Sequence, residues 1–154
     1  MPEIRPVTKD NWKELIRLKV REDQTHFVAS NVYSIAEAQF GDDYDGHWDL
    51  QPFGIYDDTN TPVGFLMYGY NFEYPEYQAF IIRLMVDEKH QGRGYGRFGM
   101  EKMLEIFRAN ERIKEVGISY EPENEVARKL YASLGFVETG KMLGDETEAI
   151  LRLR

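Results

Sequence analysis

The sequence of 154 residues contains no cysteine. This absence excludes a disulfide framework, a thiolate metal site and an enzyme-thiol nucleophile, and it agrees with a reducing compartment. No apolar run approaches the roughly 20 residues of a membrane-spanning helix, and the first residues, MPEIRPVTKDNW, lack the apolar core of a signal peptide. We therefore expect a cytoplasmic protein with no membrane partner.

Positive charge is scarce, because 19 Lys and Arg stand against 27 Asp and Glu, for a net charge of −8. This balance argues against nucleic acid as a partner and permits a cationic one. The three histidines, His26, His47 and His90, show no metal-ligand spacing, so we expect no metal. Repeats and low-complexity runs are missing too, and the length predicts one domain over residues 1–154.

A glycine-rich stretch follows an apolar run in the second half of the chain. Residues 80–86, FIIRLMV, are long enough for a buried strand, and after Gly92, Gly94 and Gly96 the apolar residues recur at helical spacing. Glycines let a backbone come close to a ligand, and the free N–H groups at a helix start favour anions. A strand, glycine turn and helix in this order therefore predict a phosphate site.

Glycine turns of this kind also occur where nothing binds. Against that alternative, His90, Arg93 and Arg97 gather here in an acidic chain. The spacing does not suit a dinucleotide fold, whose GxGxxG comes near the start of a βαβ unit with an acidic residue about 20 positions later. The Gly-Lys-Ser/Thr ending of a Walker A loop is absent as well.

Residues 91–96, QGRGYG, resemble the acetyl-coenzyme A loop of the GNAT acetyltransferase superfamily, Gln/Arg-x-x-Gly-x-Gly/Ala. A second pattern of that superfamily follows at the expected distance, with Asn124, Ala127, Leu130, Tyr131, Gly135 and Phe136 at its fixed positions. The resemblance covers almost the whole chain in the order of its elements. It implies a single-domain α/β fold, acetyl-coenzyme A as cosubstrate and no metal.

The order of elements agrees with a mixed, strongly twisted sheet of about six or seven strands with helices on both faces. We expect strands at residues 3–7, 53–56, 63–70, 77–86, 116–120, 136–139 and 148–153. Residues 41–52, GDDYDGHWDLQP, predict a loop. Helices are expected after Thr8 and Gly96 and from Ser34 and Asn124, the last ending at Gly135.

The resemblance also assigns the cofactor contacts. It implies that backbone N–H groups hold the pyrophosphate along Gln91, Gly92, Arg93, Gly94, Tyr95, Gly96 and Arg97. The strand before the loop is expected to splay from its neighbour, so that the backbone of Leu84, Met85 and Val86 pairs with the pantetheine arm and donates to the thioester carbonyl; the same residues can also be ordinary sheet core. Asn124 is a helix cap, a pantetheine ligand or both, and Ala127 belongs to the same cofactor pattern.

Tyr131 has two interpretations. One is a core tyrosine whose hydroxyl is satisfied nearby; the other, implied by the resemblance and preferred here, is the general acid for the coenzyme sulfur. A tyrosine pKa near 10, against roughly 8.5 for a thiol, keeps the hydroxyl protonated until the thiolate appears. No general base is assigned, because Ile82, followed by Arg83, stands where many relatives carry glutamate. A carboxylate acting through water, or His26 or His90, remains open.

The acceptor side is expected between residues 18 and 38, which resemble the bacterial spermine/spermidine acetyltransferase branch. Gln24, Phe27 and Asn31 recur at helical spacing, and such a polar and aromatic stripe suits a pocket wall. We expect the carboxylates near its mouth to be Glu22, Glu73 and Glu76.

The predicted reaction is acetyl transfer to a primary amine of spermine or spermidine. Its alternatives are a protein amine, an aminoglycoside or another small amine as acceptor, or a non-catalytic coenzyme A-binding module. The many aromatic side chains predict a homodimer.

Overall fold

The computed structural model describes residues 1–154. Its strands are β1 (Glu3–Pro6), β2 (Asp42–Asp43), β3 (His47–Tyr56), β4 (Pro62–Tyr70), β5 (Ala79–Val86), β6 (Glu115–Tyr120), β7 (Val137–Leu143) and β8 (Glu146–Arg152). Its helices are α1 (Trp12–Leu15), α2 (Asn31–Ala38), α3 (Tyr95–Arg108) and α4 (Glu125–Ser133), with short 3-10 helices η1 (Glu22–Gln24) and η2 (Glu88–His90). None of the helices has the length and apolar character that crossing a membrane requires.

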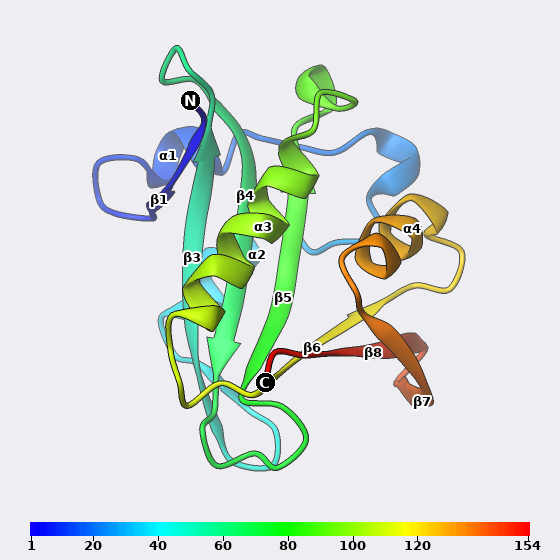
Figure 1. Ribbon diagram of the computed structural model, residues 1–154. Helices are drawn as coiled ribbons and strands as arrows, with labels where there is room; N and C mark the ends of the chain where they lie inside the picture. Colours follow the sequence, from blue (N-terminus) through cyan, green and yellow to red (C-terminus); the bar gives the residue numbers. More distant parts are fainter.

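The strands form one mixed sheet in the order β1-β3-β4-β5-β6-β8-β7, with β2 paired to β3. Every pairing is antiparallel except that of β5 with β6. Figure 1 shows α3 in front of β4 and β5 and the segment with α1 and α2 behind them. The predicted α/β architecture is confirmed, but the sheet has eight strands rather than six or seven.

The additional strand lies in residues 41–52, for which the prediction of a loop was wrong. Here β2 pairs with the start of β3, and β3 runs on without interruption to Tyr56. Its burial alternates over the first residues, with Trp48 and Leu50 each 5 % exposed and their neighbours outside. That period of two is a strand signal, which the surrounding Asp and Gly residues concealed.

Two helix starts also differ from the prediction. Helix α2 begins a turn before Ser34, because Ser30 is its N-cap and accepts a hydrogen bond from the Tyr33 N–H at 3.2 Å. The Ser34 hydroxyl instead donates to the Ser30 carbonyl. Helix α1 is only four residues long and is preceded by Asn11, so Thr8 does not cap it.

Helix α3 is fixed against the sheet by its apolar face, formed by Met100, Met103, Leu104 and Phe107, all at most 2 % exposed. The Phe107 ring packs edge-on against Tyr68 of β4, with centroids 5.0 Å apart. Gly99 allows the close approach, because a Cβ there would lie 3.0 Å from Ile55 Cδ1 and 3.2 Å from Leu84 Cδ1. The packing therefore places the first turn of α3 beside the end of β5.

Strands β5 and β6 separate along their length. They pair only from Ala79 to Ile81 on β5 and from Val116 to Ile118 on β6, and beyond this point the two strands diverge (Figure 1). A bulge at Ile82, where the register with β4 shifts, marks the start of the divergence. The backbone edge of Leu84–Val86 that faces β6 is consequently not paired with a strand, which is the splay implied by the resemblance.

Candidate functional site

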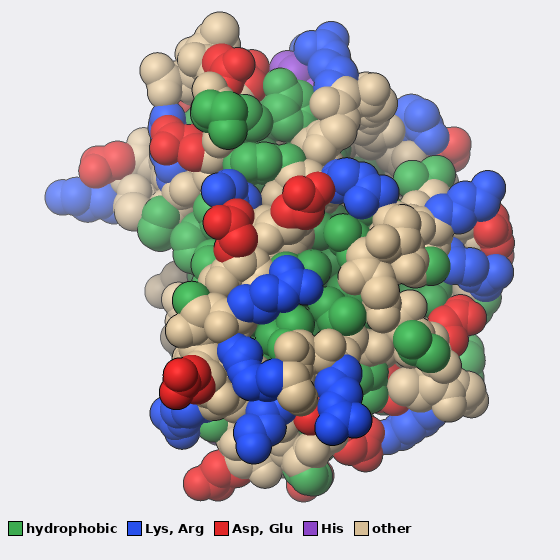
Figure 2. All heavy atoms as spheres, viewed as in Figure 1, with side chains coloured by type: hydrophobic (Ala, Val, Ile, Leu, Met, Phe, Trp, Pro, Cys, Tyr) green, Lys and Arg blue, Asp and Glu red, His purple; other side chains and the backbone are tan.

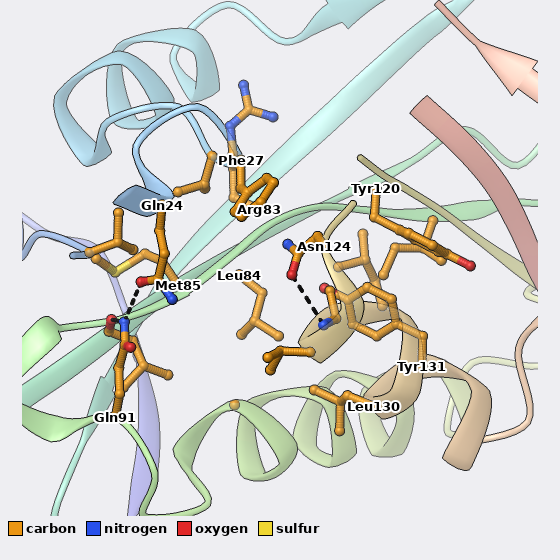
Figure 3. A pocket seen from close by; sticks show the side chains of 18 of the residues that line it. Gln24, Phe27, Arg83, Leu84, Met85, Gln91, Tyr120, Asn124, Leu130 and Tyr131 are labelled. Carbon is orange, nitrogen blue, oxygen red and sulfur yellow. Dashed lines mark hydrogen bonds between the residues drawn. The ribbon is translucent and has the colours of Figure 1, made fainter. Parts of the chain in front are cut away.

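A cavity of about 880 Å³ opens where β5 and β6 diverge. Its walls come from the glycine loop, the start of α4, the ends of β5 and β6, residues 20–29 and the first residue of β8. Of the predicted cofactor residues, all but Arg93 line it: Leu84, Met85, Val86, Gln91, Gly92, Gly94, Tyr95, Gly96, Arg97, Asn124, Ala127 and Tyr131. Gln24 and Phe27, predicted for the acceptor side, line it as well, and Figure 3 shows them across the cavity from Leu130 and Tyr131.

The glycine loop is open to an approaching anion. Gly92 and Gly94 have φ of 78° and 89°, in the left-handed region that side chains disfavour. A Cβ at either position would meet no atom within 4 Å. Gly94 is the N-cap of α3 and has no side chain to satisfy the first N–H groups of the helix. These free donors, together with the helix dipole, fit a phosphate group.

Positive charge gathers near this loop despite the acidic balance of the chain. Figure 2 shows Lys and Arg side chains on the face that carries α3. The Arg97 guanidinium, in the first turn of α3, donates to the Ser133 hydroxyl of α4 at 2.8 Å, and so links the two helices that border the loop. The local electrostatics favour an anionic group at the start of α3.

Gln91 joins the glycine loop to the opposite wall of the cavity. Its Nε2 donates to the Gln24 Oε1 at 2.9 Å and to the Val86 carbonyl at 3.0 Å. Figure 3 shows the first of these bonds between the two labelled side chains. Gln24 Oε1 also accepts from the Arg21 N–H. Residues 21–24 are therefore held against the loop by one amide side chain.

Asn124 is the N-cap of α4, as one of its two interpretations predicted. Its Oδ1 accepts from the Ala127 N–H at 3.2 Å, which Figure 3 also marks. This bond satisfies one of the unpaired donors at the helix start. Because Asn124 and Ala127 both line the cavity, the cap also fixes where α4 begins beside it. Direct contact of Asn124 with a cofactor stays a prediction.

Tyr131 lies on the cavity-facing side of α4 and is 8 % exposed. Its ring packs against Tyr120 and Phe136, with centroid distances of 5.4 and 6.2 Å. Burial raises the pKa of Tyr131 well above the ordinary tyrosine value, and Tyr120 and Glu146 raise it further. No hydrogen bond within the chain holds its hydroxyl, so the group is a neutral donor available to the cavity.

Tyr120 lines the same cavity but its hydroxyl is already used. It donates to the Glu138 Oε2 at 3.1 Å, and burial followed by this hydrogen bond raises the pKa of Tyr120 to about 12. The two neighbouring tyrosines are therefore not equivalent, because only Tyr131 has a free hydroxyl. The alternative of a satisfied core tyrosine describes Tyr120 rather than Tyr131.

Sequence reasoning missed several residues that line the cavity, chiefly Ser119, Tyr120 and Glu146. Glu146 is the one carboxylate in the lining, and its Oε1 accepts from the Ser119 hydroxyl at 2.6 Å. Arg83 also lines the cavity. Its guanidinium points toward α2 in Figure 3 and pairs with Glu37 at 3.2 Å, whereas its Nε is buried without a hydrogen-bond partner. No motif in the sequence marks these residues.

The remaining predicted acceptor residues lie outside the cavity lining. Glu22 is exposed in η1, Glu73 is exposed after β4, and Glu76 pairs with Lys141 at 3.5 Å. Asn31 is 4 % exposed, and its Nδ2 donates to the buried Leu15 carbonyl at 2.8 Å. The structure gives Asn31 a bond that holds α2 to the end of α1.

Replacing Asn31 by alanine should lower the free energy of unfolding by about 0.5–1.5 kcal/mol, because the buried Leu15 carbonyl loses this donor and keeps only the bond from the Leu18 N–H at 3.3 Å. We expect the KM of an amine acceptor to stay within about twofold. Denaturant unfolding and steady-state kinetics measure the two effects, with the exposed Gln39→Ala on the same helix region as control. A large rise in KM at unchanged stability would instead return Asn31 to the acceptor site.

Comparison with known proteins identifies related sequences and folds. The sequence profile described as the Acetyltransferase (GNAT) family matches residues 12–136. A spermine/spermidine N(1)-acetyltransferase of Bacillus subtilis is 27% identical over 143 residues, which cover 90% of each chain.

Solved structures share the fold at lower identity. The spermidine N-acetyltransferase from Vibrio cholerae, in complex with CoA and spermine, superposes with a TM-score of 0.75 at 15% identity, over 99% of this chain and 95% of that one. An aminoglycoside acetyltransferase in complex with coenzyme A gives the same TM-score of 0.75 at 13% identity, over 99% and 95%. The same fold thus occurs in proteins named for different acceptors.

Proposed function

Because the chain belongs to the GNAT acetyltransferase family, we propose that it transfers the acetyl group of acetyl-coenzyme A to a primary amine of spermine or spermidine, with Tyr131 as the general acid. One observation carries the reaction: a neutral tyrosine hydroxyl without a partner faces the same cavity as an open glycine loop. Family membership alone would not distinguish an active enzyme from a binding module.

The residues present fit coenzyme A. The free N–H groups around Gly94 and the start of α3 would hold its pyrophosphate, and the unpaired edge of Leu84–Val86 would pair with its pantetheine arm. When bound, acetyl-coenzyme A supplies the acetyl group as a thioester. Tyr131 lines the same cavity from α4, and in this proposal its hydroxyl protonates the sulfur that departs.

The identity of the acceptor rests on the relatives and on charge. A polyamine acetyltransferase is among the relatives that match most of the chain, and four carboxylates, Glu146 among them, gather at one end of the cavity. Burial raises the pKa of Glu121, and the neighbouring charges of Asp145, Glu123 and Glu146 raise it further, so these groups lie close enough to act on one another. A polycation would relieve this repulsion.

A comparison of amines tests the acceptor. With acetyl-coenzyme A and thiol release as the signal, spermine and spermidine should have kcat/KM values at least about tenfold above those of simple monoamines and peptides. Their KM should rise at least about threefold from 0.1 M to 1 M salt, where the screening length falls from about 10 to about 3 Å.

Two other outcomes are informative. If the kcat/KM values of polyamines do not exceed those of monoamines and the KM of polyamines is independent of salt, the acceptor is a different amine. The proposal of acetyl transfer then still stands. If no amine releases thiol although coenzyme A binds, the chain is a non-catalytic coenzyme A-binding module. The predicted homodimer and cytoplasmic location stay predictions, and sedimentation at micromolar concentration tests the first.

A further inference from the structure

The proposed function lacks a general base, because Ile82 stands where many GNAT enzymes carry glutamate. A primary amine with a pKa near 10 is neutral in only about one molecule in a thousand at pH 7. We propose that Glu146 takes the proton that the acceptor amine loses before it attacks, an inference that rests on the proposed function. In this proposal the carboxylate comes from β8, because β5 has Ile82 rather than glutamate at the usual position.

The sheet topology brings Glu146 to the cavity. Strand β8 pairs with β6 from Arg152 opposite Glu115 to Thr147 opposite Tyr120. Glu146 is therefore the first residue beyond the end of β6, on the side where β6 has separated from β5. Among the residues that line the cavity, it alone carries a carboxylate. A base placed here faces the unpaired edge of β5 across the cavity.

A hydrogen bond fixes the orientation of the Glu146 side chain. The Ser119 hydroxyl donates to its Oε1 at 2.6 Å, while Oε2 has no hydrogen-bond donor from the protein. The side chain is half-buried, so one oxygen is anchored and the other is available to an amine or to a bridging water. Tyr131 lines the same cavity from α4, and the charge of Glu146 contributes to raising the pKa of Tyr131.

The surroundings of Glu146 contain other titratable groups, and they are less suited to the role. Glu121, Glu123 and Asp145 lie around it but do not line the cavity. Their negative charge favours the arrival of a cation. His26 lines the cavity, but its ring is exposed and rests on Phe27, with centroids 4.0 Å apart. Tyr120 is bonded to Glu138.

The proton balance uses Glu146 and Tyr131 in turn. The ammonium gives one proton to Glu146, directly or through water, and Glu146 later releases it to solvent. The neutral nitrogen then forms a bond to the thioester carbon, and the carbon–sulfur bond breaks. Tyr131 gives its proton to the departing thiolate, and the second proton that the nitrogen loses as the amide forms restores Tyr131. The products are an N-acetylated amine, the free thiol of coenzyme A and one proton.

The test is Glu146→Gln, because glutamine keeps the shape and still accepts from Ser119 but takes no proton. At pH 7 the variant should lose about 10²-fold in kcat/KM for spermidine, within the range of general-base effects, with the Kd of coenzyme A unchanged. The loss should shrink as pH rises toward the pKa of the amine. Glu101→Gln removes the same charge from an exposed position on α3, outside the cavity lining and away from the carboxylates around Glu121, and should stay within about threefold of the parent.

An acceptor of low basicity separates a base from a structural group. Trifluoroethylamine is already neutral at pH 7, so its acetylation should be nearly equal in the parent and in Glu146→Gln. If Glu146→Gln loses kcat/KM equally for spermidine and trifluoroethylamine, or keeps the parent's rate and pH profile, Glu146 is not the base. The proposed function stands in either case. A parent protein that releases no thiol with any amine overturns both.

Discussion

Replacing Tyr131 by phenylalanine should lower kcat by about 10²–10⁴-fold, the usual contribution of a positioned general acid. The Kd of coenzyme A should change by less than about threefold, because the ring and its packing against Tyr120 and Phe136 are kept. The variant removes only a hydroxyl that has no partner in the protein, so its unfolding temperature should stay close to the parent's. Stopped thiol-release assays and calorimetric titration measure the two constants separately.

Tyr120→Phe is the matched control for this prediction. The two tyrosines line one cavity 5.4 Å apart, but the Tyr120 hydroxyl is bound to Glu138 and should not reach the reacting sulfur. Loss of the Tyr120 hydroxyl should lower the free energy of unfolding by about 1 kcal/mol and should lower kcat by less than about fivefold. Equal losses of kcat in the two variants, or a Tyr131→Phe variant as fast as the parent, would remove Tyr131 from the chemistry.

The pH dependence of the parent gives an independent check on Tyr131. The general acid acts in its protonated form, and burial raises the pKa of Tyr131 above the ordinary tyrosine value. Protonated Tyr131 is therefore present throughout neutral and moderately alkaline pH, and kcat should not fall as pH rises through the ordinary tyrosine range near 10. A decline of kcat centred near pH 10 or below would show that the acid is not the buried Tyr131 hydroxyl.

The glycine loop and the cap of α4 in the candidate site could be predicted from sequence because local requirements determine them. Left-handed backbone at Gly92 and Gly94 needs glycine, and a helix start needs a cap such as Asn124. The apolar spacing of α3 and α4 then places these residues on known faces. Each of these signals lies within a few residues of the feature it predicts, so one sequence is sufficient to find them.

The cavity wall that carries Ser119 and Glu146 could not be predicted in the same way, because long-range strand pairing builds it. Ser119 and Glu146 are 27 residues apart, and only the register of β6 with β8 brings them into one hydrogen bond. Glu73 and Glu76 follow β4 and therefore lie at the end of β5 opposite the glycine loop. Their proximity in sequence to aromatic residues does not indicate which end of β5 they occupy. Periodicity predicts which face a residue occupies, but not which strand lies next to it.

Replacing Gly94 by valine should raise the Kd of coenzyme A by about 10²-fold or more. The added side chain projects into the open space above the loop, where no protein atom lies within 4 Å of its Cβ, and it blocks the approach of a phosphate to the first N–H groups of α3. Hydrogen bonds to charged groups contribute about 1.5–3 kcal/mol each, so losing two of them corresponds to roughly 10²–10⁴-fold in affinity. Calorimetric titration of the folded variant measures this loss.

Gly140→Val distinguishes a blocked site from a strained backbone. Gly140 in β7 has φ of 84°, close to the 89° of Gly94, and a Cβ there also meets nothing within 4 Å. Both valine variants should therefore lose a similar free energy of unfolding, about 1–3 kcal/mol, from the disfavoured conformation. Only Gly94→Val should lose affinity for coenzyme A. If Gly94→Val binds the cofactor like the parent, or if Gly140→Val loses it equally, the glycine loop is not the phosphate site and its open backbone serves only the turn into α3.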